Sequence, residues 1–231
     1  MLTTSPQQYD PIFDRHNDTW VFDLDNTLYA AECNLFKQID QKIGSYVQKV
    51  LGLPPEEARV IQKGYLLQYG TTLKGLMDNH SVDVDHYLDS VHDIDFSPVK
   101  RDEKLRAAIQ KLEGRKLVFT NASAPYSVEI LQRLGIEDLF EDVFDIIAAE
   151  LLPKPMTEVY DKFIKDHAVD PNRSVMFEDM VRNLKPAHDL GMGTVWINTG
   201  DEWGKANYDA STVHAEAPNL SDWLHDFTIR K

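Results

Sequence analysis

The segment TWVFDLDNT, residues 19–27, places two carboxylates at the end of a short apolar run. Its first part, Thr19–Leu24, is rich in β-branched and aromatic residues, which predicts a strand buried on both faces. Asp23 and Asp25 are separated by a single residue. Because buried carboxylates without a partner are costly, we expect positive charge beside the end of this strand.

Apolar runs of the same kind recur along the rest of the chain. They are Lys116–Thr120, Val143–Ala149, Ser174–Glu178 and Gly193–Ile197. Amphipathic stretches with helical spacing lie between them, and Gly135 and Gly191 stand where two of these helices would end. The alternation of strands and helices predicts an α/β fold, with a doubly wound, Rossmann-like parallel sheet as its core.

Residues 31–96 interrupt this alternation, because the segment contains helical patterns and no convincing strand. LFKQIDQKIGSYVQKVLG (residues 35–52) has apolar residues at helical spacing, and PPEEARVIQKGYLLQYG (residues 54–70) begins with prolines and acids suited to a helix start. We therefore predict a discontinuous Rossmann-like core, residues 1–30 and 97–231, with a helical module inserted at 31–96.

The composition predicts a folded protein that does not bind long polyanions. Of its 231 residues, 42% are hydrophobic, which is enough for a substantial core. The formal net charge of −14 would repel a nucleic acid polymer. A small anion could still bind where the local charge is positive.

Three features favour a cytoplasmic location. Cys33 is the sole cysteine, so an internal disulfide is impossible. No apolar run approaches the ~20 residues of a membrane span. MLTTSPQQYDPIFDRHND, residues 1–18, is a polar lead-in without the form of a signal peptide. We expect a cytoplasmic protein that does not bind membranes and is either a monomer or a homodimer.

Polar residues follow each of the first four predicted strands. Besides Asp23 and Asp25 they are Thr120, Asn121, Lys154, Glu178, Asp179 and, slightly later, Asn183. The carboxyl ends of parallel strands meet at one edge of the sheet, so these groups should converge there. Clustered carboxylates without nearby His or Cys favour Mg²⁺, which keeps room for a substrate phosphate oxygen. The Thr120 hydroxyl and the Lys154 ammonium suit the remaining phosphate oxygens.

A bound phosphate would give the two first-strand aspartates different roles. One carboxylate could attack phosphorus and form an aspartyl phosphate. The other could protonate the leaving alkoxide and then accept a proton from the attacking water. Each motif alone has a plainer explanation, since Asp-x-Asp often caps a helix and a lysine before proline is usually solvated. Their shared order, each after its own strand, favours the functional interpretation.

Four of these motifs resemble those of the haloacid dehalogenase (HAD) superfamily, in the same order. They are DLDNT (23–27), Thr120–Asn121, Lys154 and EDMVRN (178–183). The resemblance implies that Asp23 is the nucleophile and that Asp25 is the acid/base. It implies phosphate binding by Thr120 and Asn121, and a lysine, Lys154, that steadies the nucleophile and the phosphoryl group. The implied metal ligands are Asp23, Asp179 and the Asp25 carbonyl, with Glu178 or Asn183 completing the surrounding shell.

The resemblance also implies that the helical module at 31–96 is a C1-type cap domain and that residues 1–30 and 97–231 form the catalytic core. Within the module, YLLQYGTTLKGLM (residues 65–77) is similar to the cap signature of bacterial pyrimidine 5′-nucleotidases of HAD subfamily IA. The resemblance implies hydrolysis of UMP and CMP, with candidate contacts from Tyr65, Tyr69, Thr71, Thr72 and Lys74. Alternatives within the superfamily are a sugar-phosphate or phosphoglycolate phosphatase, a dehalogenase and a mutase. A non-catalytic module that binds phosphometabolites is an alternative of another class.

Overall fold

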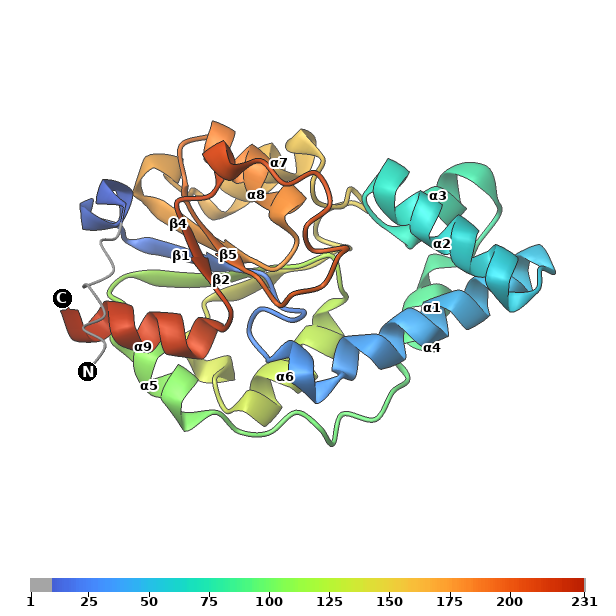
Figure 1. Ribbon diagram of the computed structural model, residues 1–231, viewed down its shortest axis with the longest axis horizontal. Helices are drawn as coiled ribbons and strands as arrows, with labels where there is room; N and C mark the ends of the chain where they lie inside the picture. Colours follow the sequence, from blue (N-terminus) through green and yellow to red (C-terminus); the bar gives the residue numbers. More distant parts are fainter. Residues whose placement is uncertain (1–9, 231) are drawn as a thin grey trace, which may run out of the picture.

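One parallel sheet organises the computed structural model, which describes residues 10–230 (Figure 1). The N-terminal part of the predicted polar lead-in, residues 1–9, lies outside the described residues. The strands found in the described part of the chain are β1 (Thr19–Phe22), β2 (Arg115–Phe119), β3 (Asp142–Phe144), β4 (Ser174–Glu178), β5 (Gly193–Ile197) and β6 (Ala215–Ala217). The predicted α/β fold with a doubly wound sheet is confirmed.

The strand order is β3-β2-β1-β4-β5-β6, with every neighbouring pair parallel. The chain runs outward from β1 in one direction through β2 and β3, then returns to pair β4 on the other side of β1. This reversal makes the carboxyl ends of β1, β2 and β4 the place where an open α/β sheet forms its binding crevice. In the register, Phe22 of β1 lies opposite Val118 and Phe177.

Helices cover both faces of the sheet (Figure 1). One face carries α5 (Glu103–Gln110), α6 (Ala124–Leu134) and α9 (Leu220–Arg230), and the other carries α7 (Thr157–His167) and α8 (Val181–Asp189). Along β1 the side chains alternate between the two apolar cores: Phe22 packs with the first group and Val21 with the second. Burial on both faces explains why the strands are continuously apolar in sequence. Short 3₁₀ helices also occur, at Pro11–Asp14, Ala31–Cys33, Glu137–Leu139, Pro171–Arg173 and Ala210–Thr212.

The third predicted strand, Val143–Ala149, is wrong beyond Phe144. Asp145 ends the strand, because its carboxylate accepts the backbone N–H of Ala148 at 2.8 Å and that of Ala124 at 2.7 Å. These bonds turn the chain and also bind the start of α6. The sequence prediction missed β6, because the short segment Ala-Glu-Ala lacks the branched residues typical of strands.

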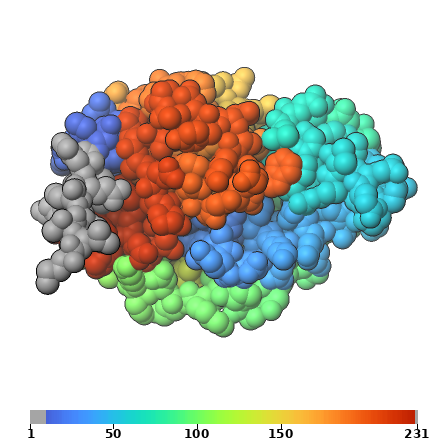
Figure 2. All heavy atoms as spheres, viewed as in Figure 1, coloured from blue at the N-terminus to red at the C-terminus, as the bar shows by residue number. Residues whose placement is uncertain are grey.

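Four helices lie between β1 and α5, beside the carboxyl edge of the sheet. They are α1 (Leu35–Leu51), α2 (Pro55–Tyr69), α3 (Thr72–Asn79) and α4 (Val84–His92), and we call them the cap helices. They share an apolar cluster of their own, which includes Val47, Leu76 and Val91. In Figure 2 the cap helices, blue to cyan, pack directly against the part that contains the sheet. Among residues 10–230, no helix has both the length and the apolar character needed to cross a membrane.

Two glycines of the cap helices allow a matched test of how tightly α2 and α3 pack. A Cβ on Gly75 of α3 would lie 2.3 Å from Cγ of Tyr65, whereas a Cβ on Gly64 of α2 would meet nothing within 4 Å. We expect Gly75→Ala to lower the free energy of unfolding by about 1–3 kcal/mol through overpacking. Gly64→Ala should raise it by up to ~1 kcal/mol through helix propensity.

Urea unfolding followed by circular dichroism measures both glycine variants, with unchanged m-values as the condition for comparing them. If both alanines stabilise the protein to the same extent, then α2 and α3 do not pack as described.

Candidate active site

A buried lysine lies at the centre of the carboxyl edge of the sheet. The Lys154 side chain is 1% exposed, and its Nζ lies 2.7 Å from Asp23 Oδ1, 2.7 Å from Glu178 Oε2 and 2.7 Å from the Phe119 carbonyl. These contacts use all three N–H donors of the ammonium. Burial lowers the pKa of Lys154, but the charges of Asp23 and Glu178 outweigh it and raise the pKa above its ordinary value. The lysine therefore remains charged.

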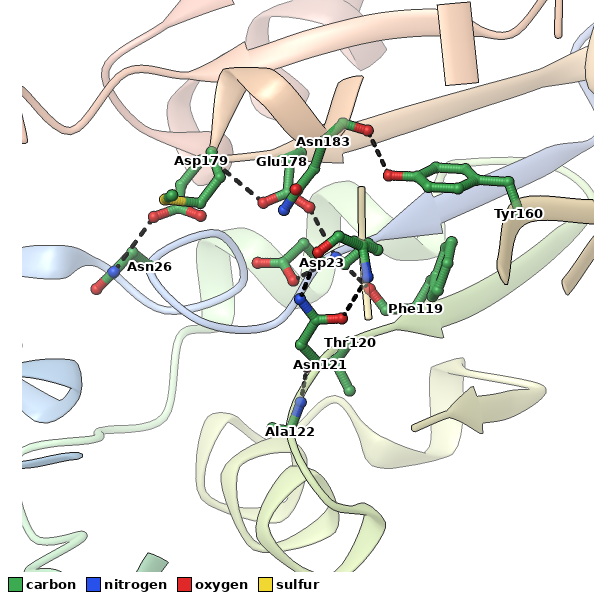
Figure 3. Close-up of polar contacts among 12 residues, drawn as sticks. Asp23, Asn26, Phe119, Thr120, Asn121, Ala122, Tyr160, Glu178, Asp179 and Asn183 are labelled. Carbon is green, nitrogen blue, oxygen red and sulfur yellow. Dashed lines mark hydrogen bonds and ion pairs between the residues drawn. The ribbon is translucent and has the colours of Figure 1, made fainter. Parts of the chain in front are cut away.

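Asn121 holds the backbone of Lys154 in place. Its Oδ1 accepts the Lys154 N–H at 2.8 Å, and its Nδ2 donates to the Lys154 carbonyl at 3.2 Å. Figure 3 shows Asn121 reaching into the group of residues around Asp23. The loop after β2 thus fixes the loop after β3, and with it the position of the ammonium.

Three buried carboxylates form a candidate metal site. Asp23, Glu178 and Asp179 offer oxygens that all lie within 4.8 Å of one another. Nearby, Asn183 Oδ1 is buried and has no hydrogen-bond partner among the described residues. Oxygen donors alone are the ligands preferred by Mg²⁺, and an unpaired buried amide oxygen calls for a positive partner. The residues present therefore fit a hard divalent cation.

The surrounding contacts fix the two acidic residues at the end of β4. Asn26 Nδ2 donates to Asp179 Oδ2 at 3.3 Å, and Trp196 Nε1 donates to the Asp179 carbonyl at 2.8 Å. Glu178 Oε1 accepts the Met180 N–H at 3.1 Å. Figure 3 shows the bond between Asn26 and Asp179. With Lys154 on its other oxygen, Glu178 is held from both sides.

The electrostatics of the protein alone disfavour so much negative charge. Burial, with a smaller contribution from Glu178, raises the pKa of Asp23 to about 8 against the opposing charge of Lys154. Burial and Glu178 also raise the pKa of Asp179 well above its ordinary value. A divalent cation would reverse both shifts, because opposite charge favours the ionised carboxylate.

Thr120 occupies the end of β2 beside this group. Its side chain is 1% exposed, and its Oγ1 accepts the Ala122 N–H at 3.0 Å (Figure 3). The hydroxyl proton remains free to be donated to a ligand.

Two tyrosines anchor the side chain of Asp25. Tyr29 and Tyr126 each donate a hydrogen bond to Asp25 Oδ1, at 2.6 Å in both cases. Burial raises the pKa of Asp25, and the two hydroxyls oppose that rise. The sequence analysis missed both tyrosines. Tyr126 is 101 positions away from Asp25, and no local spacing indicates the contact.

A cavity of about 670 Å³ joins the sheet edge to the cap helices. Of the predicted site residues, its lining includes Asp23, Asp25, Thr120, Asn121, Glu178, Asp179, Asn183, Thr71 and Thr72. Lys154 lies behind this lining, against Asp23. Ligand sites commonly have volumes of about 300–1,000 Å³, so the cavity is large enough for a small phosphorylated molecule.

The remaining predicted cap contacts lie away from the cavity lining. Tyr65 bonds His80 at 2.8 Å and packs edge-on against Tyr69, while Lys74 bonds Asp78 at 2.5 Å. The bond from Tyr65 to His80 joins α2 to the end of α3, whereas the other two contacts lie within a single helix. The sequence placed them on α2 and α3 but could not say which helix face meets the core.

Thr71 and Thr72 do reach the cavity, and both also have structural partners. Thr71 Oγ1 caps α3 by accepting the Lys74 N–H at 3.1 Å. Thr72 Oγ1 donates to the Gln62 carbonyl at 3.1 Å. Their hydroxyls keep further hydrogen-bonding capacity for a ligand.

Arg182 ties the cap helices to the sheet edge. It is 7% exposed and donates to the Leu66 carbonyl at 2.8 Å and to the Gly70 carbonyl at 3.0 Å, where α2 ends. Gly70 has a φ of +87°, and a Cβ there would lie 2.9 Å from the Lys154 carbonyl. Glycine is therefore required for this close approach. The sequence analysis included Arg182 in EDMVRN without assigning it a role.

A polar cluster on the cap helices forms part of the cavity lining. Asp40 of α1 bonds Lys63 at 2.8 Å and Gln62 at 2.8 Å, and it also pairs with Arg59. The Lys63 ammonium lies 5.0 Å from the centre of the Trp203 ring, which belongs to the loop after β5. No local sequence pattern indicates this cluster, because its side chains meet only when α1 and α2 pack.

Comparison with known proteins places the sequence among hydrolases. Residues 20–197 match the family model described as haloacid dehalogenase-like hydrolase. Phosphate metabolism protein 8 of Saccharomyces cerevisiae is 28% identical over 208 residues, covering 82% of this chain. This chain spans only 64% of the length of that yeast protein.

Two solved structures share the fold at low sequence identity. A HAD phosphatase from Thermococcus onnurineus is 18% identical with a TM-score of 0.56, and the alignment covers 89% of this chain and 95% of that one. The HAD-hydrolase YfnB from Bacillus subtilis, bound to magnesium, is 14% identical with a TM-score of 0.58. That alignment covers 92% of this chain and 99% of YfnB.

The raised pKa of Asp23 predicts a pH-dependent response to a divalent cation. Without metal, the folded state keeps the Asp23 proton up to about pH 8, whereas the unfolded state releases it near 3.8. This stabilising contribution is therefore lost as the pH rises through about 8. Mg²⁺ must displace that proton at pH 6 but not at pH 9, so it should stabilise the protein more at pH 9.

Thermal unfolding with and without Mg²⁺ measures this effect. At ten times its Kd, Mg²⁺ should stabilise the protein by about 1.4 kcal/mol and raise the Tm by roughly 3–5 °C at pH 9. Asp23→Asn should reduce the difference between the two pH values, and the raised pKa of Asp179 should account for what remains. If Mg²⁺ raises the Tm of the wild-type protein equally at pH 6 and pH 9, then burial does not raise the pKa of Asp23 as described.

Proposed function

Because the chain belongs to the haloacid dehalogenase-like hydrolase family, we propose that it is a Mg²⁺-dependent phosphatase of phosphomonoesters, with UMP and CMP as its preferred substrates. The observation that carries this proposal is the buried Lys154 ammonium, 2.7 Å from Asp23 Oδ1 and beside the acidic group. A fixed positive charge of this kind steadies a nucleophilic carboxylate next to a bound phosphate. The similarity to Phosphate metabolism protein 8 supports phosphate chemistry.

The first chemical step transfers the phosphoryl group to the protein. A carboxylate oxygen of Asp23 forms a bond to phosphorus while the bond from phosphorus to the leaving-group oxygen breaks. Asp25 gives its proton to that oxygen, so the leaving group departs as an alcohol. Lys154 keeps the nucleophile in place, and the hydroxyl of Thr120 and the amide of Asn121 bind phosphoryl oxygens.

The second step releases phosphate and restores the protein. Water attacks phosphorus and gives a proton to the Asp25 carboxylate, while the bond from phosphorus to the Asp23 oxygen breaks. Asp23 returns to its carboxylate form and Asp25 to its protonated form. The raised pKa of Asp25 suits a group that must carry a proton in one step and accept one in the next.

Asp23, Asp179 and the main-chain carbonyl of Asp25 would hold the Mg²⁺ ion. When bound, the ion supplies positive charge that stabilises the phosphoryl oxygens. Glu178 already accepts bonds from Lys154 and from the Met180 N–H, which suits it to a supporting position. The unpartnered Asn183 Oδ1 is the better candidate to complete the shell around the ion.

We further infer that residues 31–96 act as a cap domain over a core formed by residues 1–30 and 97–231. The cavity has lining residues from both parts, so closure of the cap helices would exclude water from the reacting groups. The bonds from Arg182 to the end of α2 favour the closed arrangement. Cap residues would then contact the leaving group, which is the part that differs between phosphomonoesters.

The preference for pyrimidine nucleotides rests on the cap. Residues 65–77 resemble the nucleotidase signature, and the cavity of about 670 Å³ has room for a nucleoside monophosphate. Thr71, Thr72 and Lys63 offer polar groups within the lining for a sugar or a base. A tyrosine stacking face is not part of this proposal, because Tyr65 and Tyr69 lie away from the lining.

Substitution of the nucleophile tests the reaction. We expect Asp23→Asn to lower kcat at least about a hundredfold, since a carboxamide cannot form the aspartyl phosphate. The surface variant Asp189→Asn serves as the matched control and should keep wild-type activity. Steady-state phosphate release gives both values. A variant that keeps more than about a tenth of wild-type kcat, a loss under ~1.4 kcal/mol, would remove Asp23 from this role.

A substrate panel tests the preference. We expect kcat/KM for UMP and CMP to exceed that for AMP and GMP by roughly ten- to a hundredfold, because one buried hydrogen bond left unmade costs about 1–3 kcal/mol. Phosphoglycolate and glucose phosphates complete the panel under identical conditions. If one of these exceeds UMP by tenfold or more, the nucleotidase assignment fails and the phosphatase assignment stands. If Mg²⁺ brings no phosphate release from any ester, p-nitrophenyl phosphate included, the protein is a binding module.

A further inference from the structure

We propose that Tyr29 and Tyr126 are positioning residues that orient the Asp25 carboxylate, and that they link its orientation to the two chain segments joining the cap helices to the core. This inference rests on the proposed phosphatase function, in which Asp25 protonates the leaving group. The observation behind it is that two buried hydroxyls donate to the same oxygen of one carboxylate.

The shared acceptor determines which oxygen can carry the proton. Both hydroxyls lie 2.6 Å from Asp25 Oδ1, and the two hydroxyl oxygens lie 3.3 Å apart. An oxygen that accepts two short hydrogen bonds is a poor site for a proton. The proton that Asp25 transfers is therefore carried on Oδ2, and the two bonds to Oδ1 fix the direction in which Oδ2 points.

A carboxylate in this place needs such anchors. Asp25 is half-buried in the loop after β1 and lines the cavity close to Asp23. A free carboxylate there could rotate toward the metal site or toward solvent. Tyr29 and Tyr126 are each 3% exposed, and the bonds from their hydroxyls to Asp25 Oδ1 oppose both rotations.

The two tyrosines belong to different parts of the connection to the cap helices. Tyr29 lies just before the 3₁₀ helix Ala31–Cys33, through which the chain enters α1. Tyr126 lies in the first turn of α6, where residues of the returning segment cover its ring. His92, the last residue of α4, stacks on that ring at 4.3 Å and 15°, and Phe96 contacts it at 5.8 Å.

His92 also bonds directly to the core. Its Nδ1 lies 3.1 Å from Ser123 Oγ, and burial lowers its pKa to about 4, so the stacked ring is neutral. A movement of the cap helices that displaced His92 would uncover Tyr126. The Asp25 carboxylate is thus best oriented when the cap helices lie as they do in this structure.

Leaving-group dependence tests the proposal with conservative variants. We expect Tyr29→Phe and Tyr126→Phe each to lower kcat/KM for UMP roughly tenfold, which is part of the 10²–10⁴-fold that general acids typically contribute. For p-nitrophenyl phosphate the loss should be under about twofold, because p-nitrophenolate departs without a proton. The ratio kcat/KM isolates the first step, which ends when the leaving group departs.

Two comparisons exclude a merely structural effect. Tyr46→Phe alters another buried tyrosine, which lies on α1 and bonds His86 at 3.4 Å. This variant should leave kcat/KM unchanged for both UMP and p-nitrophenyl phosphate. In an Asp25→Asn background, each tyrosine variant should lower kcat/KM for UMP by less than about a further twofold, because the tyrosines act through the Asp25 carboxylate.

The possible outcomes separate the two hypotheses. Equal losses for UMP and p-nitrophenyl phosphate, or no loss for either, would overturn the positioning role while leaving the phosphatase function intact. Losses that persist undiminished in the Asp25→Asn background would also overturn it. A wild-type protein that hydrolyses no phosphomonoester would overturn both. If UMP is a poor substrate, the alkyl phosphate of the panel that is hydrolysed best replaces it in this comparison. If circular dichroism shows that one tyrosine variant does not fold, the other tyrosine variant tests the positioning role.

Discussion

The ammonium of Lys154 is the constraint on which the rest of the site depends. Three carboxylates converge at the end of the sheet, and this single buried cation contacts two of them. Removing one partner from such a buried ion pair typically costs 3–5 kcal/mol, because a charge is left without compensation. When all three carboxylates are ionised, the positive charge of Lys154 leaves the group with a net charge of about −2. A divalent cation would offset that charge, which is why these oxygens fit such an ion.

The sheet topology brings these groups together, and the cap helices line the cavity beside them. Asn121 fixes Lys154 from the neighbouring loop, and the register places Asp23 level with the ends of β2 and β4. Arg182 and Gly70 attach the end of α2 to the same edge. Because Gly70 also lies against the Lys154 carbonyl, the end of α2 and the buried lysine are held at the same edge of the sheet.

The sequence was sufficient to predict the α/β fold and the convergence of the core motifs, because each motif follows a buried strand and parallel strands end at one edge. It was less informative where side chains act over a distance. The carboxylate of Asp145 ends β3 early by capping α6. Tyr65 has an apolar helical neighbourhood that is compatible with either face, and packing turned it toward His80. Contacts such as Tyr126 with Asp25 arise only from tertiary structure.

Trp203 gives the protein an optical signal of its own. Trp20, Trp196 and Trp223 are at most 5% exposed within the sheet core, whereas Trp203 is half-buried, lines the cavity and faces the Lys63 ammonium of α2 at 5.0 Å. The emission of an indole responds to neighbouring charge and to water. Opening of the cap helices would withdraw the ammonium and hydrate this one ring while leaving the other three unchanged. Fluorescence of the unlabelled protein would therefore report such an opening in real time.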